Sequence, residues 1–329
     1  MIPRWISERM DDYIFDVIKL VYRGYRDRMP AYRPPAELES PALDQISPPE
    51  TIDLAPAPAW KGFGVEEFRF PSPLECECDE NRHTHGRLLS VDSGAPWALI
   101  VPGYSTGALP PGGYGIFQDT QALVLLKRGI NVALVTLPYH MQRKRPGCGS
   151  GEGFFSPDLA DMLLTFRQAA ADCVALVRWL QSQSPQPVGV WGTSLGGNVA
   201  GMLAAHLDDI GAVVLMEPLD NPGDTLRLHR GSREIRQALA EAGVPPEMLT
   251  EALTPVAPSS YRPKVPLERI IFVSPLWDGV IPYRFQNAFW EAWGRPERIS
   301  AAAGHLTLPL DSAINTRVAD FMATRLLRN

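Results

Sequence analysis

The sequence predicts an α/β protein, with a mostly parallel sheet and helices on both of its faces. From Phe63 onward, short apolar runs alternate with helix-length segments, which is typical of this class. The runs are apolar at successive positions, as expected of strands that are buried on both faces. The chain has 329 residues, of which 45% are hydrophobic and 21% charged, so it has enough apolar material for a large core.

Eight strands are expected in this sheet, at residues 66–70, 87–91, 97–101, 131–137, 188–191, 212–216, 269–273 and 298–302. Helices are expected near residues 116–128, 158–183, 197–207, 283–293 and 311–327. Residues 219–265 break the alternation and predict a small helical insertion. Because this insertion follows a core strand, we expect it to form a cap over the mouth of the site.

The N-terminal residues predict an amphipathic helix over about residues 6–27. Its apolar positions recur at helical spacing: Ile6, Met10, Tyr13, Ile14, Val17, Ile18 and Val21. The polar face carries mixed charge, which favours a helix that covers the core over one that lies on a membrane, and a homodimer is a further alternative. Residues 30–60 are rich in proline and predict an extended strap without regular structure. We expect residues 1–60 to pack on an α/β domain of residues 61–329.

Composition limits the partners and the compartment. The net charge of −6 predicts neither a nucleic-acid nor an anionic-membrane partner. The sequence has no run of 18 apolar residues that would span a membrane, and charged residues interrupt any N-terminal apolar run that could serve as the core of an export signal. Four cysteines are too few for a disulfide framework in a chain of this length. We therefore expect a cytoplasmic protein that acts on small molecules.

A serine stands at a sharp strand-to-helix junction in residues 188–197, which read VGVWGTSLGG. Gly192 and Gly196 flank Ser194 at two residues on either side, where only small residues let the strand and the helix pack closely. The helix that follows points its N-terminal amides at the serine. The chain has no GxxxxGK[ST] or GxGxxG pattern, so a phosphate loop is the weaker interpretation. The junction predicts a nucleophile elbow.

From about Phe63 to the C-terminus, the chain resembles the α/β-hydrolase superfamily. It is most similar to the serine carboxylesterase and abhydrolase branch, which includes dienelactone hydrolases and prolyl-oligopeptidase-like enzymes. The resemblance implies the order nucleophile, acid, histidine along the chain. It assigns these roles to Ser194, to Asp278 in the DGVIP segment after residues 269–273, and to His305 in the AGH segment after the last strand.

Two other acids and one other histidine compete for these roles. Glu217 is a rival acid, because some related hydrolases carry their carboxylate after this earlier strand, and Asp220 is another. His140 lies at the top of a core strand, but in the family that loop does not supply the base. The chemistry needs all three groups, because a serine hydroxyl attacks well only when an imidazole accepts its proton and a carboxylate orients that imidazole.

The oxyanion hole is expected to combine the backbone amides of Leu195 and Tyr104. By resemblance, Gly103 takes the place of the glycine in the common His-Gly motif, with a proline where the histidine would be. Tyr104, Tyr139, His140 and Trp277 are expected to bind the substrate.

The resemblance implies a serine hydrolase that cleaves a carboxylic ester through an acyl-enzyme, without a cofactor. A peptidase or amidase with the same triad and an inactive, hydrolase-like binding protein are the alternatives. Cys76, Cys78, His83 and His85 offer potential metal ligands, but they lack the usual CxxC spacing, so no metal is expected. The basic run at residues 143–145 is expected to be a solvated loop near the rim of the site.

Overall fold

The computed structural model describes residues 2–21, 24–35, 42–108 and 113–327. In this part of the chain, one sheet has the strand order β1-β2-β3-β5-β4-β6-β7-β8-β9. Its strands are β1 (Asp53–Trp60), β2 (Phe63–Pro71), β3 (His83–Ser90), β4 (Trp97–Val101), β5 (Asn131–Thr136), β6 (Gly189–Thr193), β7 (Ala212–Met216), β8 (Ile270–Pro275) and β9 (Glu297–Ala301). All eight predicted strands are present, and β1 is a ninth.

The sheet divides into a parallel part and an antiparallel edge. Strands β4 to β9 pair in parallel, whereas β1, β2 and β3 pair antiparallel and β3 joins β5. Every residue of β4, β5, β6, β7 and β8 is buried. This confirms the prediction of strands that are covered on both faces for these five. The prediction is wrong for β9, which is an edge strand with exposed Glu297 and Ser300.

Strand β1 corrects the prediction that residues 30–60 have no regular structure. It contains Pro56 and Pro58, which donate no backbone hydrogen bond. Because β1 is an edge strand that pairs only with β2, its prolines need not meet a second neighbour. Proline therefore weakened the strand signal here without preventing the strand.

Ten α-helices are described: α1 (Arg4–Val21), α2 (Tyr25–Arg28), α3 (Ile116–Leu126), α4 (Leu159–Gln183), α5 (Leu195–His206), α6 (Pro222–Leu228), α7 (Arg233–Glu241), α8 (Pro246–Ala252), α9 (Tyr283–Ala292) and α10 (Ser312–Leu326). Helices α3 and α10 pack together on one face of the sheet, and α4 and α5 pack on the other. The predicted N-terminal helix includes residues 22 and 23, which lie outside the described residues.

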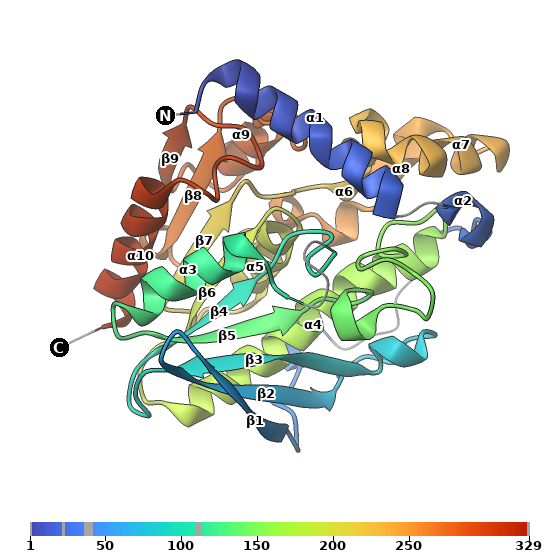
Figure 1. Ribbon diagram of the computed structural model, residues 1–329. Helices are drawn as coiled ribbons and strands as arrows, with labels where there is room; N and C mark the ends of the chain where they lie inside the picture. The colour runs from blue at the N-terminus through green and yellow to red at the C-terminus, as the bar shows by residue number, and fades with distance from the viewer. Residues whose placement is uncertain (1, 22–23, 36–41, 109–112, 328–329) are drawn as a thin grey trace.

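Two segments outside the layered core lie at the edge of the sheet where β7, β8 and β9 end (Figure 1). One is α1, which crosses this edge. The other consists of α6, α7 and α8, which follow β7 in the chain. The end of a parallel sheet at which its strands finish is where α/β folds place their ligands. Both segments are therefore positioned to shape a site.

The prediction that residues 143–145 form a solvated loop is wrong for Arg143. Arg143 is fully buried, and its Nη1 lies 2.7 Å from Asp172 Oδ2. It also donates hydrogen bonds to the carbonyls of Thr136 and Asn81. The guanidinium thus joins the end of β5 to α4 and to the segment before β3.

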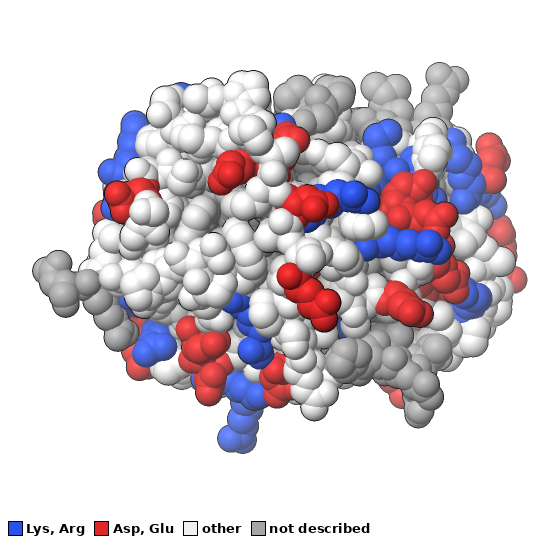
Figure 2. Space-filling model, turned by 90° about the horizontal axis from the view of Figure 1, so that it is seen from below, with Lys and Arg blue, Asp and Glu red and all other residues white. Residues whose placement is uncertain are grey.

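The face in Figure 2 carries basic and acidic side chains side by side, without a large patch of one sign. Among the described residues, no helix combines the length and the apolar character needed to cross a membrane.

Candidate active site

Ser194 occupies a strained turn between β6 and α5. Its backbone has φ 57° and ψ −115°, which a residue with a side chain rarely adopts. A Cβ at Gly192 would collide with the Gly196 carbonyl, and one at Gly196 would collide with the Val101 carbonyl. The Ser194 amide donates to the Met216 carbonyl over 2.9 Å, which ties the turn to β7. The sequence therefore forms the tight elbow that its glycines predict.

Ser194, His305 and Asp278 form a continuous hydrogen-bonded chain. His305 Nε2 lies 2.9 Å from Ser194 Oγ, and His305 Nδ1 lies 2.9 Å from Asp278 Oδ2. The three residues come from the ends of β6, β8 and β9, which are separate in sequence and adjacent at this edge of the sheet. In this order, the imidazole can take a proton from the serine while the carboxylate holds its other nitrogen.

The Asp278 carboxylate accepts hydrogen bonds on both oxygens. The amides of Val280 and Ile281 donate to Oδ1 over 2.8 and 2.7 Å. The Gln286 side chain, from α9, donates to Oδ2 over 2.9 Å beside the bond to His305. These donors stabilise a carboxylate anion and fix its orientation. Gln286 has no sequence signal that ties it to this role, because it is an ordinary polar residue in a helix.

Glu217 lies on the other side of the imidazole. Its Oε1 is 3.8 Å from His305 Nε2, and its Oε2 has no hydrogen-bond partner in the described structure. Burial raises the pKa of Glu217 well above its ordinary value. Burial alone would lower the pKa of His305, but the negative charges of Asp278, Glu217 and Asp11 outweigh burial and raise it. The imidazolium form is therefore favoured at this site.

The structure separates the other candidate acid from the histidine. Asp220 accepts hydrogen bonds from the amide and the hydroxyl of Ser259, over 3.0 and 2.7 Å.

Within the described residues, Glu217, Asp278 and His305 are the one group of three acidic, His or Cys side chains whose ligand atoms lie within 4.8 Å of one another. The two ring nitrogens of His305 already bind Asp278 and Ser194. Neither nitrogen is therefore free to bind a metal ion in this arrangement.

A cavity of about 760 Å³ opens onto Ser194. Tyr104 and Leu195 line it next to the serine, so the two residues with the predicted oxyanion amides face one space. Further lining residues come from α2, from the loop before α4 and from the insertion; among them are Met29, Phe155, Leu219, Leu226, Arg233 and Arg236. The wall thus combines aromatic and aliphatic side chains with arginines.

Tyr139, His140 and Trp277 do not line this cavity, although they were expected to bind substrate. Tyr139 is buried, and its hydroxyl donates to Asp161 over 3.0 Å. Trp277 is half-buried, and its amide donates to the Ala303 carbonyl.

His140 supports the loop that contains Tyr104. Its Nε2 accepts a hydrogen bond from the Ser105 amide over 3.0 Å, and its Nδ1 lies 2.8 Å from the Pro138 carbonyl. Burial lowers the pKa of His140 to about 4, so the ring is neutral and donates through Nδ1. Its edge also meets the Tyr104 ring, with centroids 5.8 Å apart. The residue therefore supports the loop that contains Tyr104 and does not line the cavity.

Fold and site together define the class of this protein: it has the α/β-hydrolase fold. Within that class, residues 117–217 match the family described as alpha/beta hydrolase domain containing 18. An uncharacterized protein of Mycobacterium tuberculosis strain H37Rv is 27% identical over 229 residues, which are 68% of this chain and 53% of the relative. The chain therefore spans about half the length of this curated relative.

Solved structures share the fold at low sequence identity. An acetyl xylan esterase from Paenibacillus sp. R4 is 14% identical with a TM-score of 0.65, and the match covers 90% of this chain and 98% of that one. Acetyl xylan esterase 1 from Thermoanaerobacterium sp. JW/SL YS485 is 16% identical with a TM-score of 0.64, over 92% and 93% of the two chains. The acylaminoacyl peptidase of Pyrococcus horikoshii is 15% identical with a TM-score of 0.55, over 81% and 42%.

Proposed function

We propose that this protein is a serine hydrolase that cleaves carboxylic esters through an acyl-enzyme. One observation carries the proposal: the hydroxyl of the strained Ser194 lies 2.9 Å from an imidazole whose other nitrogen lies 2.9 Å from the Asp278 carboxylate. A serine in this arrangement is activated by an adjacent base that a third group orients. Ser194 is the nucleophile, His305 the base and Asp278 the acid.

The reaction runs in two halves. Ser194 Oγ attacks the ester carbonyl carbon while its proton passes to His305 Nε2, and the amides of Leu195 and Tyr104 bind the developing oxyanion. The intermediate collapses with cleavage of the bond to the alcohol oxygen, which takes the proton from His305. Water then attacks the acyl-enzyme, its proton passes to His305, and Ser194 regains a proton as the acid leaves.

The cavity supports a medium-sized, partly apolar substrate. Its volume of about 760 Å³ and the side chains of Phe155, Leu219 and Leu226 fit an apolar acyl or alcohol group beside Ser194. Residues 219–265, which contain α6 to α8, are proposed to be the cap that sets the size of this cavity. Two structurally similar proteins are acetyl xylan esterases by name, which also supports the proposal of an esterase.

Intact-mass analysis after treatment with a fluorophosphonate tests the proposal. The parent protein is expected to gain one adduct, and Ser194→Ala is expected to gain none. Heat-denatured parent serves as the control for labelling that does not need the folded site. A folded parent without an adduct would favour the alternative of an inactive, hydrolase-like binding protein. Where the adduct forms, p-nitrophenyl esters compared with the matching p-nitroanilides separate an esterase from an amidase.

A further inference from the structure

Asp11, from the middle of α1, is buried against the two loops that carry Asp278 and His305. Its side chain is 1% exposed. Its Oδ2 accepts hydrogen bonds from the Gly279 and His305 amides over 3.0 and 2.8 Å, and its Oδ1 accepts one from the Leu306 amide over 2.9 Å. One carboxylate therefore binds the residue after the acid, the histidine itself and the residue after the histidine.

The two loops are shaped to receive this carboxylate. A Cβ at Gly304 would lie 2.8 Å from Asp11 Oδ2, and a Cβ at Gly279 would lie 3.2 Å from Asp11 Cβ. One helical turn earlier, the Ser7 hydroxyl lies 3.1 Å from that of Thr307. Both loops thus have a glycine where α1 comes closest, which leaves room for the Asp11 side chain.

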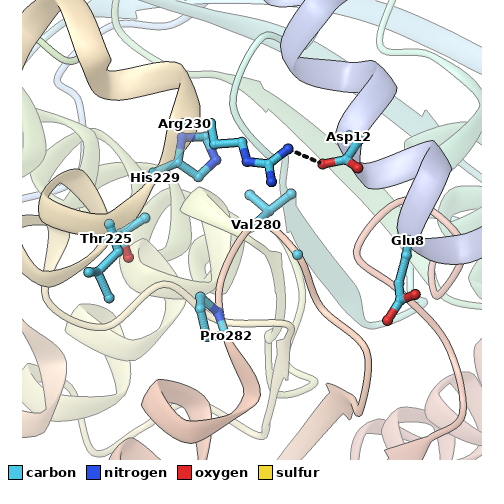
Figure 3. A pocket seen from close by; sticks show the side chains of 9 residues that line it. Glu8, Asp12, Thr225, His229, Arg230, Val280 and Pro282 are labelled. Atoms are coloured by element: carbon cyan, nitrogen blue, oxygen red, sulfur yellow. Dashed lines mark hydrogen bonds and ion pairs between the residues drawn. The ribbon is translucent and has the colours of Figure 1, made fainter.

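A helix that only covers a core does not need this group. Burial of a carboxylate costs free energy that an apolar side chain would not, and burial raises the pKa of Asp11 despite its three amide bonds and the nearby His305. The neighbouring Asp12 shows the ordinary case. It is exposed and pairs with the exposed Arg230 over 3.0 Å, beside a small pocket of about 270 Å³ (Figure 3). Asp11 thus calls for a role beyond packing.

We propose that Asp11 is a positioning residue, which binds the acid loop and the histidine loop into one unit and adds a second buried anion that stabilises the His305 imidazolium. This inference rests on the proposed serine hydrolase activity. When His305 takes the proton of Ser194, the Asp11 charge favours the ion that forms, while its amide bonds hold the ring between Ser194 and Asp278.

Four titratable groups of the described structure interact with His305. Asp278 and Glu217 reach the ring from the ends of β8 and β7, and Asp11 reaches its loop from α1. The fourth is His229 in the insertion, which is neutral because burial lowers its pKa to about 3. Asp11 is thus the contributor to this charge that comes from outside the α/β core.

Asp11→Asn, measured in the full chain, is the direct test. An amide has one acceptor oxygen, so the variant loses at least one of the three bonds and the charge. We expect kcat to fall about 10- to 100-fold with little change in KM, because Asp11 does not line the Ser194 cavity. The acidic limb of the pH profile of kcat/KM should move to lower pH by about 1 unit.

Two variants on the same helix are the controls. Ser7→Ala removes a neutral tie to the same loop, so it should lower kcat less and leave the acidic limb where it is. Asp12→Asn makes the same chemical change one residue away, on the exposed side of the helix, and should leave kcat within about twofold of the parent. A shift of the limb in Ser7→Ala as large as that in Asp11→Asn would overturn the electrostatic part of the proposal.

Gly304→Ala tests the contact from the other side, in case Asp11→Asn does not fold. Its methyl group displaces the carboxylate without changing any charge, so kcat should fall. A folded Asp11→Asn or Gly304→Ala with the kcat and the pH profile of the parent would overturn the proposal.

An NMR titration of the His305 ring measures its pKa without any turnover, with the signal assigned by comparison with His305→Gln. A parent that neither labels nor hydrolyses esters would refute the proposed function alone, because this titration would still move in Asp11→Asn if the inference holds.

Discussion

At the scale of single residues, two carboxylates beside one imidazole are distinguished by their surroundings. Asp278 accepts hydrogen bonds on both oxygens and binds Nδ1, whereas Glu217 has one oxygen without a partner and lies nearest to Nε2. Asp278 is thus held in place by its donors, whereas burial raises the pKa of Glu217.

Asp278→Asn and the matched Glu217→Gln should therefore differ in effect. The first is expected to lower kcat by about 10³- to 10⁴-fold, because an amide cannot hold the imidazole in the required tautomer. The second should lower kcat by less than about 10-fold, since Glu217 Oε1 lies 3.8 Å from Nε2, beyond hydrogen-bond distance, and an amide of similar shape fills its place. Steady-state kinetics of both variants on one ester decides the question, and the reverse ranking would make Glu217 the acid.

The pH dependence of kcat/KM follows from the raised pKa of His305. The ring must be neutral to accept the serine proton, and its pKa in the free enzyme lies above the ordinary value of about 6.5. Activity should therefore fall as the pH decreases through a value above 6.5. A profile that stays flat down to about pH 6 would contradict the charge distribution described here.

His140→Leu should damage the reaction without touching the substrate. The change leaves the Ser105 amide without its acceptor and removes the support of the loop that carries Tyr104. Loss of one oxyanion donor costs about 10²- to 10³-fold in kcat, so a decrease of about 10- to 100-fold is expected from a displaced one. KM should stay near the parent value, because His140 does not line the cavity. A larger effect on KM than on kcat would instead make it a binding residue.

The residues that the structure brings together were predictable to the extent that local sequence marks them. Ser194, Asp278 and His305 each follow a predicted strand in a recognisable turn, so their order along the chain places them at one edge of the sheet. Asp11 bonds to amides 294 and 295 residues away, and no local pattern encodes such a contact. The sequence holds a weaker indication that Asp11 is buried: Ser7 and Asp11 are spaced to share a helix face with the apolar Ile14.

At the scale of elements, burial decides what the sequence reveals. The strands β4 to β8 are apolar throughout because both faces are covered, and they were predicted to within a few residues. Strand β1 is mostly exposed and contains two prolines, so its sequence lacks the continuous apolar run that marks a buried strand. Arg143 was misinterpreted because charge in a loop usually means exposure, whereas here an acid on α4 lies opposite.

Arg143→Met tests this tie between β5 and α4. Removal of one partner leaves the buried Asp172 with an uncompensated charge, which costs about 3–5 kcal/mol in the free energy of unfolding. Lys144→Met, the exposed neighbour, should change it by no more than about 0.5 kcal/mol. Urea denaturation of the two variants gives both values, and equal losses would show that Arg143 is not a specific tie.

At the scale of the whole molecule, three parts of the chain meet around one space. The α/β core supplies Ser194, the N-terminal segment supplies Met29 through the residues after α2, and the insertion supplies Leu226. The shape of such a space depends on long-range packing, so its lining could not be predicted from the sequence although the fold class was.

The size of the cavity predicts a preference among substrates. The kcat/KM for p-nitrophenyl esters should rise from acetate to hexanoate, by at most about fourfold per methylene group that the apolar wall covers. Met29→Trp narrows the space where the residues after α2 line it, so it should reduce hydrolysis of the hexanoate more than that of the acetate. Equal loss for both esters, or a parent that prefers the acetate, would show that the acyl chain does not occupy this cavity.

The bonds of Asp11 also bear on when the site comes into being. As the ribosome extends the chain, α1 emerges before the glycine and histidine amides that Asp11 binds, which follow it 268 and 294 residues later. The bonds of Asp11 cannot form until β8 and β9 have joined the sheet, and closing so long a loop is entropically costly. An unfinished chain that already contains Ser194 still lacks both loops that Asp11 binds, so the arrangement of Asp278 and His305 is completed only after Leu306 has been added.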